Sequence, residues 1–214
     1  MPDKTFLLIA NGELDKRTLK NIQLDRIDRI VAADGGTMKA LSYGIVPDVV
    51  IGDLDSIPPD VRKKLGGRIR FIHQPSQELN DLEKALIYCR QENAGCVIVL
   101  GFTGERIDHT MNNFSILARY DETMNLEMVD RFARMFFVRD RFEYKGKKGQ
   151  TVSLIPLGRV DGVTTKGLRY PLRDEPLHFG VREGASNECT EGPFGITIGN
   201  GVLLVFVNEM DDND

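Results

Sequence analysis

Six short apolar runs in the first 130 residues constrain the fold of this chain more than any other feature. They lie at 5–10, 29–33, 48–52, 70–73, 96–100 and 125–129. Continuous apolar runs of strand length are typical of strands that are buried on both faces of a parallel sheet. Between them lie segments with apolar residues at helical spacing, most clearly 80–89 and 108–120. Strands that alternate with helices in this way predict an α/β fold with a mostly parallel, Rossmann-like sheet.

The pattern changes after residue 130, where short apolar stretches are separated by Gly, Pro and Asp or Asn. The expected strands are 134–139, 141–144, 151–155, 162–170, 177–181, 195–198 and 202–207. No helical period occurs among them. We therefore expect two domains, an α/β domain at 1–130 and an antiparallel β domain at 131–214 that forms a small sandwich or roll.

Composition and charge exclude several classes of protein. Hydrophobic residues make up 41% of the chain, but no apolar run is longer than a strand, so we expect no membrane span. The formal charge is −4, and four negative charges stand in the last six residues: Glu209, Asp211, Asp212 and Asp214. The rest is close to neutral without a basic stripe, which argues against nucleic-acid binding. Three cysteines without C-x-x-C spacing predict free thiols in a reducing cytoplasm.

Acidic residues follow several of the predicted strands. Asp34, Asp53 and Asp55 come directly after strand runs, and Asp81 and Asp108 each open a helix. In an open α/β sheet, ligands bind beyond the carboxyl ends of the strands. If the chain stays extended after residue 52, Asp53 and Asp55 point to one side and could bind one cation. The structural alternatives are a solvated turn at Asp53 and Asp55, and helix capping at Asp81 and Asp108.

Acids that converge on one edge repel one another unless a cation neutralises them. Oxygen ligands favour a hard ion such as Mg²⁺, which commonly binds carboxylates together with substrate phosphates. Glycines beside the acids would let backbone N–H groups approach phosphate oxygens closely. These glycines are Gly12, Gly35, Gly36, Gly52, Gly101 and Gly104. Together the acids and glycines predict Mg-nucleotide chemistry.

Seven short motifs extend this pattern along the chain. They are ADGG at 33–36, GIVPD at 44–48, GDLDSI at 52–57, NDLEKA at 80–85, GFTGERIDH at 101–109, GLRYPL at 167–172 and SN at 186–187. In order and spacing the set resembles the thiamine pyrophosphokinase family. The resemblance implies transfer of the pyrophosphoryl group of ATP to the hydroxyl of thiamine, giving thiamine diphosphate and AMP. It also implies a homodimer whose active site lies between the α/β domain of one subunit and the β domain of the other.

The resemblance also implies roles for individual residues. By position, Asp53, Asp55 and Asp81 match the acids that bind Mg²⁺ and support catalysis. Ser186 and Asn187 match the thiamine-binding segment. The expected ATP-binding residues are Asp34, Gly35, Gly36, Gly104, Arg106 and Asp108. The chemistry fits this set because phosphoryl-type transfer depends on charge neutralisation and in-line placement of the reactants.

Three positions depart from the family pattern. Glu105 stands where the family commonly has glycine, so the backbone there is less free and an additional anion lies near ATP. Asn80 replaces a frequent Thr, and both can cap a helix. Some members stack a tryptophan on thiamine; this chain has none, and Phe194 is the substitute that we consider.

Some roles have alternatives. Asp55 or Asp81 could accept the proton of the substrate hydroxyl, and Arg106 could hold a phosphate or form only a surface salt bridge. His109 follows Asp108 directly, and adjacent helical residues do not face each other, so we expect a structural histidine.

Three other functions compete with this interpretation. A related pyrophosphokinase acting on a hydroxymethyl-pterin would share the α/β half, but the β half with its SN motif favours thiamine. A non-catalytic nucleotide sensor would not need all five acids. A Rossmann dehydrogenase would need G-x-G-x-x-G after the first strand, which this chain lacks.

Overall fold

The computed structural model describes residues 4–76 and 78–210, and the chain divides into two compact units between Arg131 and Phe132. Asp211, Asp212 and Asp214 of the acidic tail lie outside the described residues. Among the described residues, no helix is both long and apolar enough to cross a membrane.

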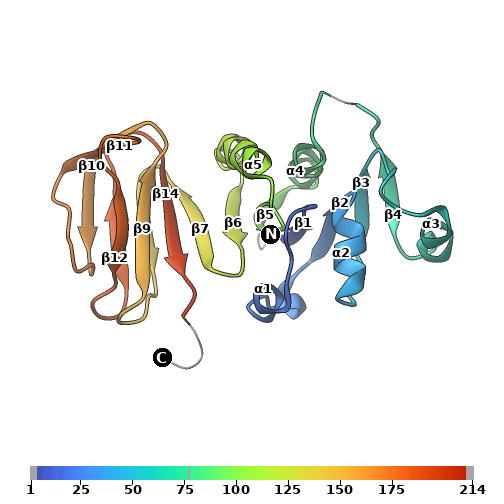
Figure 1. Ribbon diagram of the computed structural model, residues 1–214, viewed down its shortest axis with the longest axis horizontal. Helices are drawn as coiled ribbons and strands as arrows, with labels where there is room; N and C mark the ends of the chain where they lie inside the picture. Colours follow the sequence, from blue (N-terminus) through green and yellow to red (C-terminus); the bar gives the residue numbers. More distant parts are fainter. Residues whose placement is uncertain (1–3, 77, 211–214) are drawn as a thin grey trace. The chain divides into compact units, whose positions relative to one another are not determined.

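The first unit contains one six-stranded sheet with the order β6-β5-β1-β2-β3-β4 (Figure 1). Every pair of neighbouring strands in it runs parallel. The strands are β1 (Lys4–Ile9), β2 (Arg29–Ala33), β3 (Val49–Gly52), β4 (Arg70–His73), β5 (Ala94–Leu100) and β6 (Asn125–Val129). The helices are α1 (Lys16–Lys20), the 3-10 turn η1 (Leu24–Arg26), α2 (Gly36–Ser42), α3 (Pro59–Leu65), α4 (Asp81–Gln91) and α5 (Ile107–Tyr120). The predicted parallel α/β sheet is confirmed.

The strand order places the direction change of the sheet at β1. The chain adds β2, β3 and β4 on one side of β1 and then returns to add β5 and β6 on the other side. Ligands of open α/β sheets bind at such a switch point, beyond the carboxyl ends of the strands. Within this unit, α4 and α5 lie over one face of the sheet and α1 and α2 over the other (Figure 1). Leu7 and Ile9 of β1 are fully buried and pack with Ala40 of α2, as the continuous apolar run predicts.

The start of α4 is fixed by an N-cap at Asn80 and not by a reciprocal capping box, because the Glu83 carboxylate accepts from the hydroxyl of Tyr120 at 3.1 Å. The side chain of Asn80 accepts a hydrogen bond of 2.8 Å from the N–H of Glu83, as the sequence predicts. The predicted inward residues Leu82 and Cys89 are buried. In α5 the prediction is wrong for Met111, which has helical spacing but is 58% exposed.

The second unit contains two antiparallel sheets with the orders β12-β9-β14-β7 and β11-β10-β13-β8. The strands are β7 (Ala133–Val138), β8 (Arg141–Tyr144), β9 (Thr151–Pro156), β10 (Arg159–Lys166), β11 (Glu175–His178), β12 (Gly184–Glu188), β13 (Phe194–Thr197) and β14 (Leu203–Asn208). One core cluster draws buried side chains from both sheets, including Val152, Val160, Phe194 and Val205. The sheets therefore pack face to face, which confirms the predicted antiparallel β fold. The sequence pattern predicts no strand at 184–188, where the structure places β12.

Candidate active site

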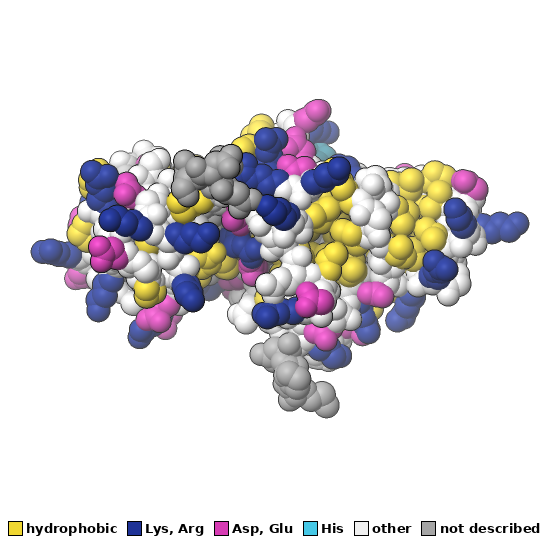
Figure 2. Space-filling view, turned by 90° about the horizontal axis from the view of Figure 1, so that it is seen from below, with side chains coloured by type: hydrophobic (Ala, Val, Ile, Leu, Met, Phe, Trp, Pro, Cys, Tyr) yellow, Lys and Arg dark blue, Asp and Glu magenta, His cyan; other side chains and the backbone are white. Residues whose placement is uncertain are grey.

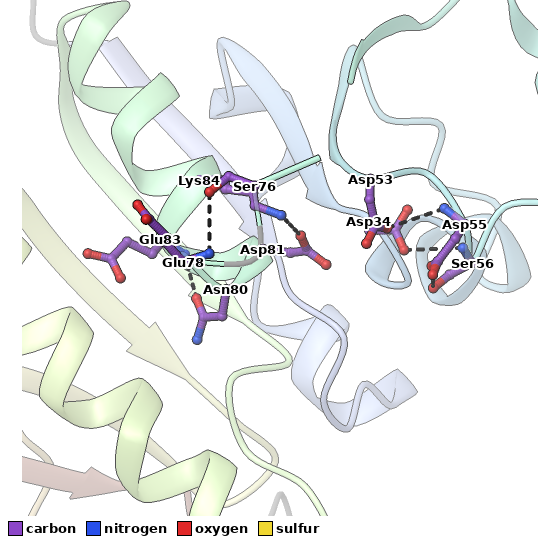
Figure 3. A network of polar contacts seen from close by, with 10 residues as sticks. All are labelled: Asp34, Asp53, Asp55, Ser56, Ser76, Glu78, Asn80, Asp81, Glu83 and Lys84. Carbon is purple, nitrogen blue, oxygen red and sulfur yellow. Dashed lines mark hydrogen bonds and ion pairs between the residues drawn. The ribbon is translucent and has the colours of Figure 1, made fainter. Parts of the chain in front are cut away.

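Three carboxylates meet at the carboxyl edge of the parallel sheet. Asp34 follows β2, Asp53 follows β3 and Asp81 opens α4. One side-chain oxygen of each lies within 4.8 Å of the others. Figure 3 shows Asp34 and Asp53 side by side, with the carboxylate of Asp81 directed toward them from the start of α4. The structure thus brings together three of the five acids that the sequence places at this edge; we call these three the acid group.

Gly52 allows these acids to approach one another. A Cβ atom added at Gly52 would lie 2.6 Å from Cβ of Asp34 and 3.2 Å from Oδ1 of Asp81. A side chain at this position would therefore push Asp34 and Asp81 away from each other. Gly52, which precedes the D-x-D motif, therefore lies directly against the acid group and leaves room for its side chains.

Asp34 is the buried member of the acid group. Its side chain is 2% exposed, and Oδ1 has no hydrogen-bond partner among the described residues. Its Oδ2 accepts a hydrogen bond of 3.3 Å from the N–H of Ser56. Burial raises the pKa of Asp34, hydrogen bonds from Ser56 oppose the shift, and the charges of Asp81 and Asp53 add to it. A buried carboxylate oxygen without a donor is costly, and a cation would satisfy it.

Replacing Asp34 by Asn is therefore expected to stabilise the metal-free protein by about 1 kcal/mol near pH 8. A carboxyl group whose folded pKa is raised costs stability above that pKa and nothing below its ordinary value near 3.9. The gain should accordingly shrink as the pH falls toward that value. Thermal unfolding of wild type and Asp34→Asn in a chelator, from pH 8 to pH 5, measures the effect. Equal unfolding temperatures throughout would show that Asp34 carries no such cost.

Asp55 is not part of the acid group, because the chain does not stay extended after residue 52, which is the condition under which Asp53 and Asp55 would point to one side. The strand ends at Gly52, and Leu54 adopts a positive φ of 65°. Leu54 is 7% exposed because it packs into the apolar cluster that includes Ile57. The exposed Asp55 instead donates its N–H to Oδ1 of Asp53 at 3.3 Å. In the structure Asp34, and not Asp55, is the third member of the acid group beside Asp53 and Asp81.

A cavity of about 710 Å³ adjoins the acid group. The loops after β1 and β5 and the first turns of α4 and α5 line it. Of the predicted site residues, four are part of the lining: Asp53, Asp81, Gly104 and Arg106. Arg106 forms an ion pair of 2.5 Å with Asp108, and both side chains are about two-thirds exposed. This pair holds down the pKa of Asp108 through its hydrogen bond and charge.

Gly35 and Gly36 are not among the residues that line this cavity. An added Cβ at Gly36 would lie 2.3 Å from the carbonyl oxygen of Ile9, and one at Gly35 would lie 2.4 Å from Nδ2 of Asn11. Their lack of side chains lets the start of α2 pack against the end of β1. Both glycines thus permit close packing, and their approach to phosphate stays a prediction.

The loops after β1 and β5 meet at Gly12. Its N–H donates to the carbonyl of Gly101 at 2.5 Å, and the N–H of Glu13 donates to the carbonyl of Thr103 at 2.6 Å. A Cβ at Gly12 would lie 2.0 Å from the oxygen of Thr103 and 2.3 Å from that of Gly101. Only glycine fits where these loops form the cavity wall.

Two lysines in the cavity wall were not predicted. Nζ of Lys84 forms an ion pair of 2.9 Å with Oδ1 of Asp81. The ammonium of Lys39 donates to the carbonyl of Asn11 at 2.6 Å and to the carbonyl of Gly12, and burial lowers its pKa. The position of Lys84, three residues after a candidate ligand on the same helix face, is a signal that could have identified it.

In the second unit, Ser186 and Asn187 belong to β12. Asn187 is 6% exposed and uses its side-chain amide on the backbone of Tyr170, accepting from the N–H at 3.0 Å and donating to the carbonyl at 2.7 Å. This fixes the backbone of Tyr170, whose side chain is 62% exposed. Phe194 is 1% exposed within the core, so the idea that it stacks on a ligand is wrong.

Charge is mixed on the surface. On the face drawn in Figure 2, Lys and Arg side chains are interspersed with Asp and Glu. That face presents no extended area of a single sign.

Known proteins resemble this chain along nearly its whole length. The model of "Thiamin pyrophosphokinase, catalytic domain" matches residues 21–129, and that of "Thiamin pyrophosphokinase, vitamin B1 binding domain" matches 141–203. Thiamine pyrophosphokinase of Bacillus subtilis is 25% identical over 208 residues, covering 94% of this chain and 97% of its own. Thiamine pyrophosphokinase 1 of Arabidopsis thaliana is 31% identical over 159 residues, covering 68% of this chain and 59% of its own.

The fold agrees with this family. The crystal structure of thiamine pyrophosphokinase from Bacillus subtilis superposes with a TM-score of 0.83 at 22% identity, covering 96% of this chain and 99% of that one. The matched residues of the catalytic-domain model include the whole acid group. On these matches, the chain belongs to the thiamine pyrophosphokinase family.

Proposed function

We propose that this protein transfers the pyrophosphoryl group of ATP to the hydroxyl of thiamine, with thiamine diphosphate and AMP as products. The observation that carries the proposal is the acid group beside the cavity, in a chain matched by both family models. Phosphoryl-type transfer requires neutralised phosphates and fixed geometry more than covalent participation of the protein. The α/β unit supplies both requirements at one sheet edge.

A divalent metal ion, Mg²⁺ in our proposal, fits the acid group. The donors are carboxylate oxygens, which hard cations prefer, and the unpartnered Oδ1 of Asp34 gains a partner when an ion binds. Asp53 and Asp81, which line the cavity, and the buried Asp34 would hold the ion. When bound, the ion neutralises phosphate charge and polarises the phosphorus under attack.

Other residues of the α/β unit bind and orient the nucleotide. Arg106, kept in place by Asp108, directs its guanidinium to a phosphate at the cavity wall. The backbone at Gly104 forms part of the cavity wall beside which the nucleotide binds. The carboxylate of Asp55 stays outside the acid group, so it remains available to accept the proton of the thiamine hydroxyl.

The β unit binds thiamine in this proposal. Ser186 is exposed at the β12 position matched by the family pattern, and Asn187 acts indirectly by fixing the backbone of Tyr170. The exposed ring of Tyr170 is the aromatic surface that this segment offers to the thiamine rings.

The protein acts as a homodimer in the cytoplasm, according to the same proposal. Large apolar side chains that a dimer could cover are exposed on α5, at Ile107 and Met111, and on the β unit, at Phe179 and Val181. The three cysteines are free, which agrees with the reducing compartment that we propose.

The experiment that tests the function is product analysis with Mg-ATP and thiamine. We expect AMP and thiamine diphosphate in equal amounts, and a particle of twice the chain mass in solution. Formation of ADP, or turnover of a hydroxymethyl-pterin while thiamine stays unchanged, would refute the assignment. A protein that binds ATP but turns over neither alcohol would instead be the nucleotide sensor considered from sequence.

A further inference from the structure

Lys84 faces the acid group from inside the protein. It lies in the second turn of α4 and is 3% exposed. Its ammonium pairs with Oδ1 of Asp81 at 2.9 Å (Figure 3) and also forms part of the cavity wall. Salt bridges between residues three apart on a helix are usually exposed and contribute little, because water screens them. Burial of this lysine at the wall of a binding cavity sets it apart from such pairs.

The oxygen that accepts from Lys84 is the Asp81 oxygen that lies nearer to Gly52. Oδ1 of Asp81 lies over Gly52, 3.2 Å from the place where a Cβ would stand, and the same Cβ would be 3.4 Å from Cγ of Asp34. A cation bound among the three acids would draw on the same Asp81 carboxylate that Lys84 already pairs with. The ammonium and the metal ion compete for it.

The negative charge of the acid group explains why a lysine is buried beside it. Three carboxylates within 4.8 Å of one another repel strongly when no ion is present. The positive charge of Lys84 offsets part of that repulsion and fixes Asp81 in position. A buried ammonium in turn needs an anionic partner at all times, because an unpaired buried charge is very costly.

We propose that Lys84 is an exchangeable counter-ion: it neutralises Asp81 in the empty site and holds a phosphoryl oxygen of the nucleotide once a metal ion has taken Asp81. This rests on the proposed function for the identity of the nucleotide. The cavity lies on the side where Lys84 is part of the wall, so a phosphate there is within its reach by rotation of the side chain. The lysine thereby couples metal binding to nucleotide binding, since each removes an obstacle to the other.

The test uses Lys84→Met and two ligands added separately. Removal of the competing cation should let the nucleotide-free protein bind Mg²⁺ about tenfold more tightly, while ATP in the presence of Mg²⁺ should bind at least tenfold more weakly. Both constants come from titration calorimetry without thiamine, so the result stands even if the protein proves not to turn thiamine over. Lys84→Arg keeps the charge and should stay within about threefold of wild type for Mg²⁺.

Tighter binding of Mg²⁺ together with weaker binding of ATP in Lys84→Met distinguishes this role from a purely structural one. Lys63→Met, at an exposed lysine on α3, is the matched control and should change neither constant. If Lys84→Met binds Mg²⁺ no more tightly than wild type, the proposal is overturned. Should that variant fail to fold by circular dichroism, Lys84→Gln takes its place, and unchanged Mg²⁺ affinity there overturns the proposal equally.

Discussion

Replacing Asp53 by Asn is expected to lower kcat for thiamine diphosphate formation by about a thousandfold, the scale seen when a preorganised electrostatic group is lost. Asp53 is the half-buried acid that follows β3 and lines the cavity. Asn keeps the shape but removes the charge that would hold Mg²⁺. The rate of AMP release with saturating Mg-ATP and thiamine measures the effect.

The fold should survive this change, because Asp53 is partly exposed and Asn has nearly the same size. Asp25→Asn, at an exposed acid on η1, is the matched control and should keep the wild-type rate. Thermal unfolding in a chelator should differ little between the variants. A variant at Asp53 that retains more than a tenth of the wild-type rate would show that the metal is held elsewhere.

Replacing Gly12 by Ala is expected to destabilise the protein by about 3 kcal/mol, since the new methyl group overlaps two backbone carbonyl groups rather than flexible side chains. For a chain of this size the loss corresponds to a fall of roughly 6–12 °C in Tm. The loops after β1 and β5 must separate to admit the methyl group, which breaks the hydrogen bond from Gly12 to Gly101. Because these loops form the cavity wall, ATP affinity should fall as well.

Thermal unfolding and ATP titration of Gly12→Ala measure both effects. Gly67→Ala is the control, because an added Cβ at Gly67 meets no atom within 4 Å. An unfolding temperature equal to that of the control would mean that the two loops are not packed as the structure shows.

The α/β half could be predicted from sequence because its strands are buried on both faces. Continuous apolar runs of strand length, such as 96–100, are typical of buried parallel strands and fit few other structures. The β half was predicted only as a class. Residues 184–188 form β12 although only Asn187 among them is buried, so no alternation marks the strand. Its pairing with β9, irregular between Gly184 and Asn187, is fixed by tertiary contacts that sequence periodicity does not reveal.

The site was predicted in outline for a similar reason. The rule that ligands bind at the carboxyl edge identified Asp34, Asp53 and Asp81. It did not reveal the turn at Leu54, which is buried at a positive φ that leucine rarely adopts and which places Asp55 outside the acid group. It also passed over Lys84, since a lysine on a helix is usually solvated and only the packing of α4 shows that this one is buried.

Asp34 also serves as a diagnostic among related sequences. Its buried, unpartnered oxygen brings no benefit to a protein that binds no ion, and exchange for a neutral residue is expected to stabilise the fold. A lineage released from selection for the reaction should therefore lose this acid early, because drift and stability act in the same direction there. The residue at position 34 would then separate working enzymes from relatives that have kept only the architecture.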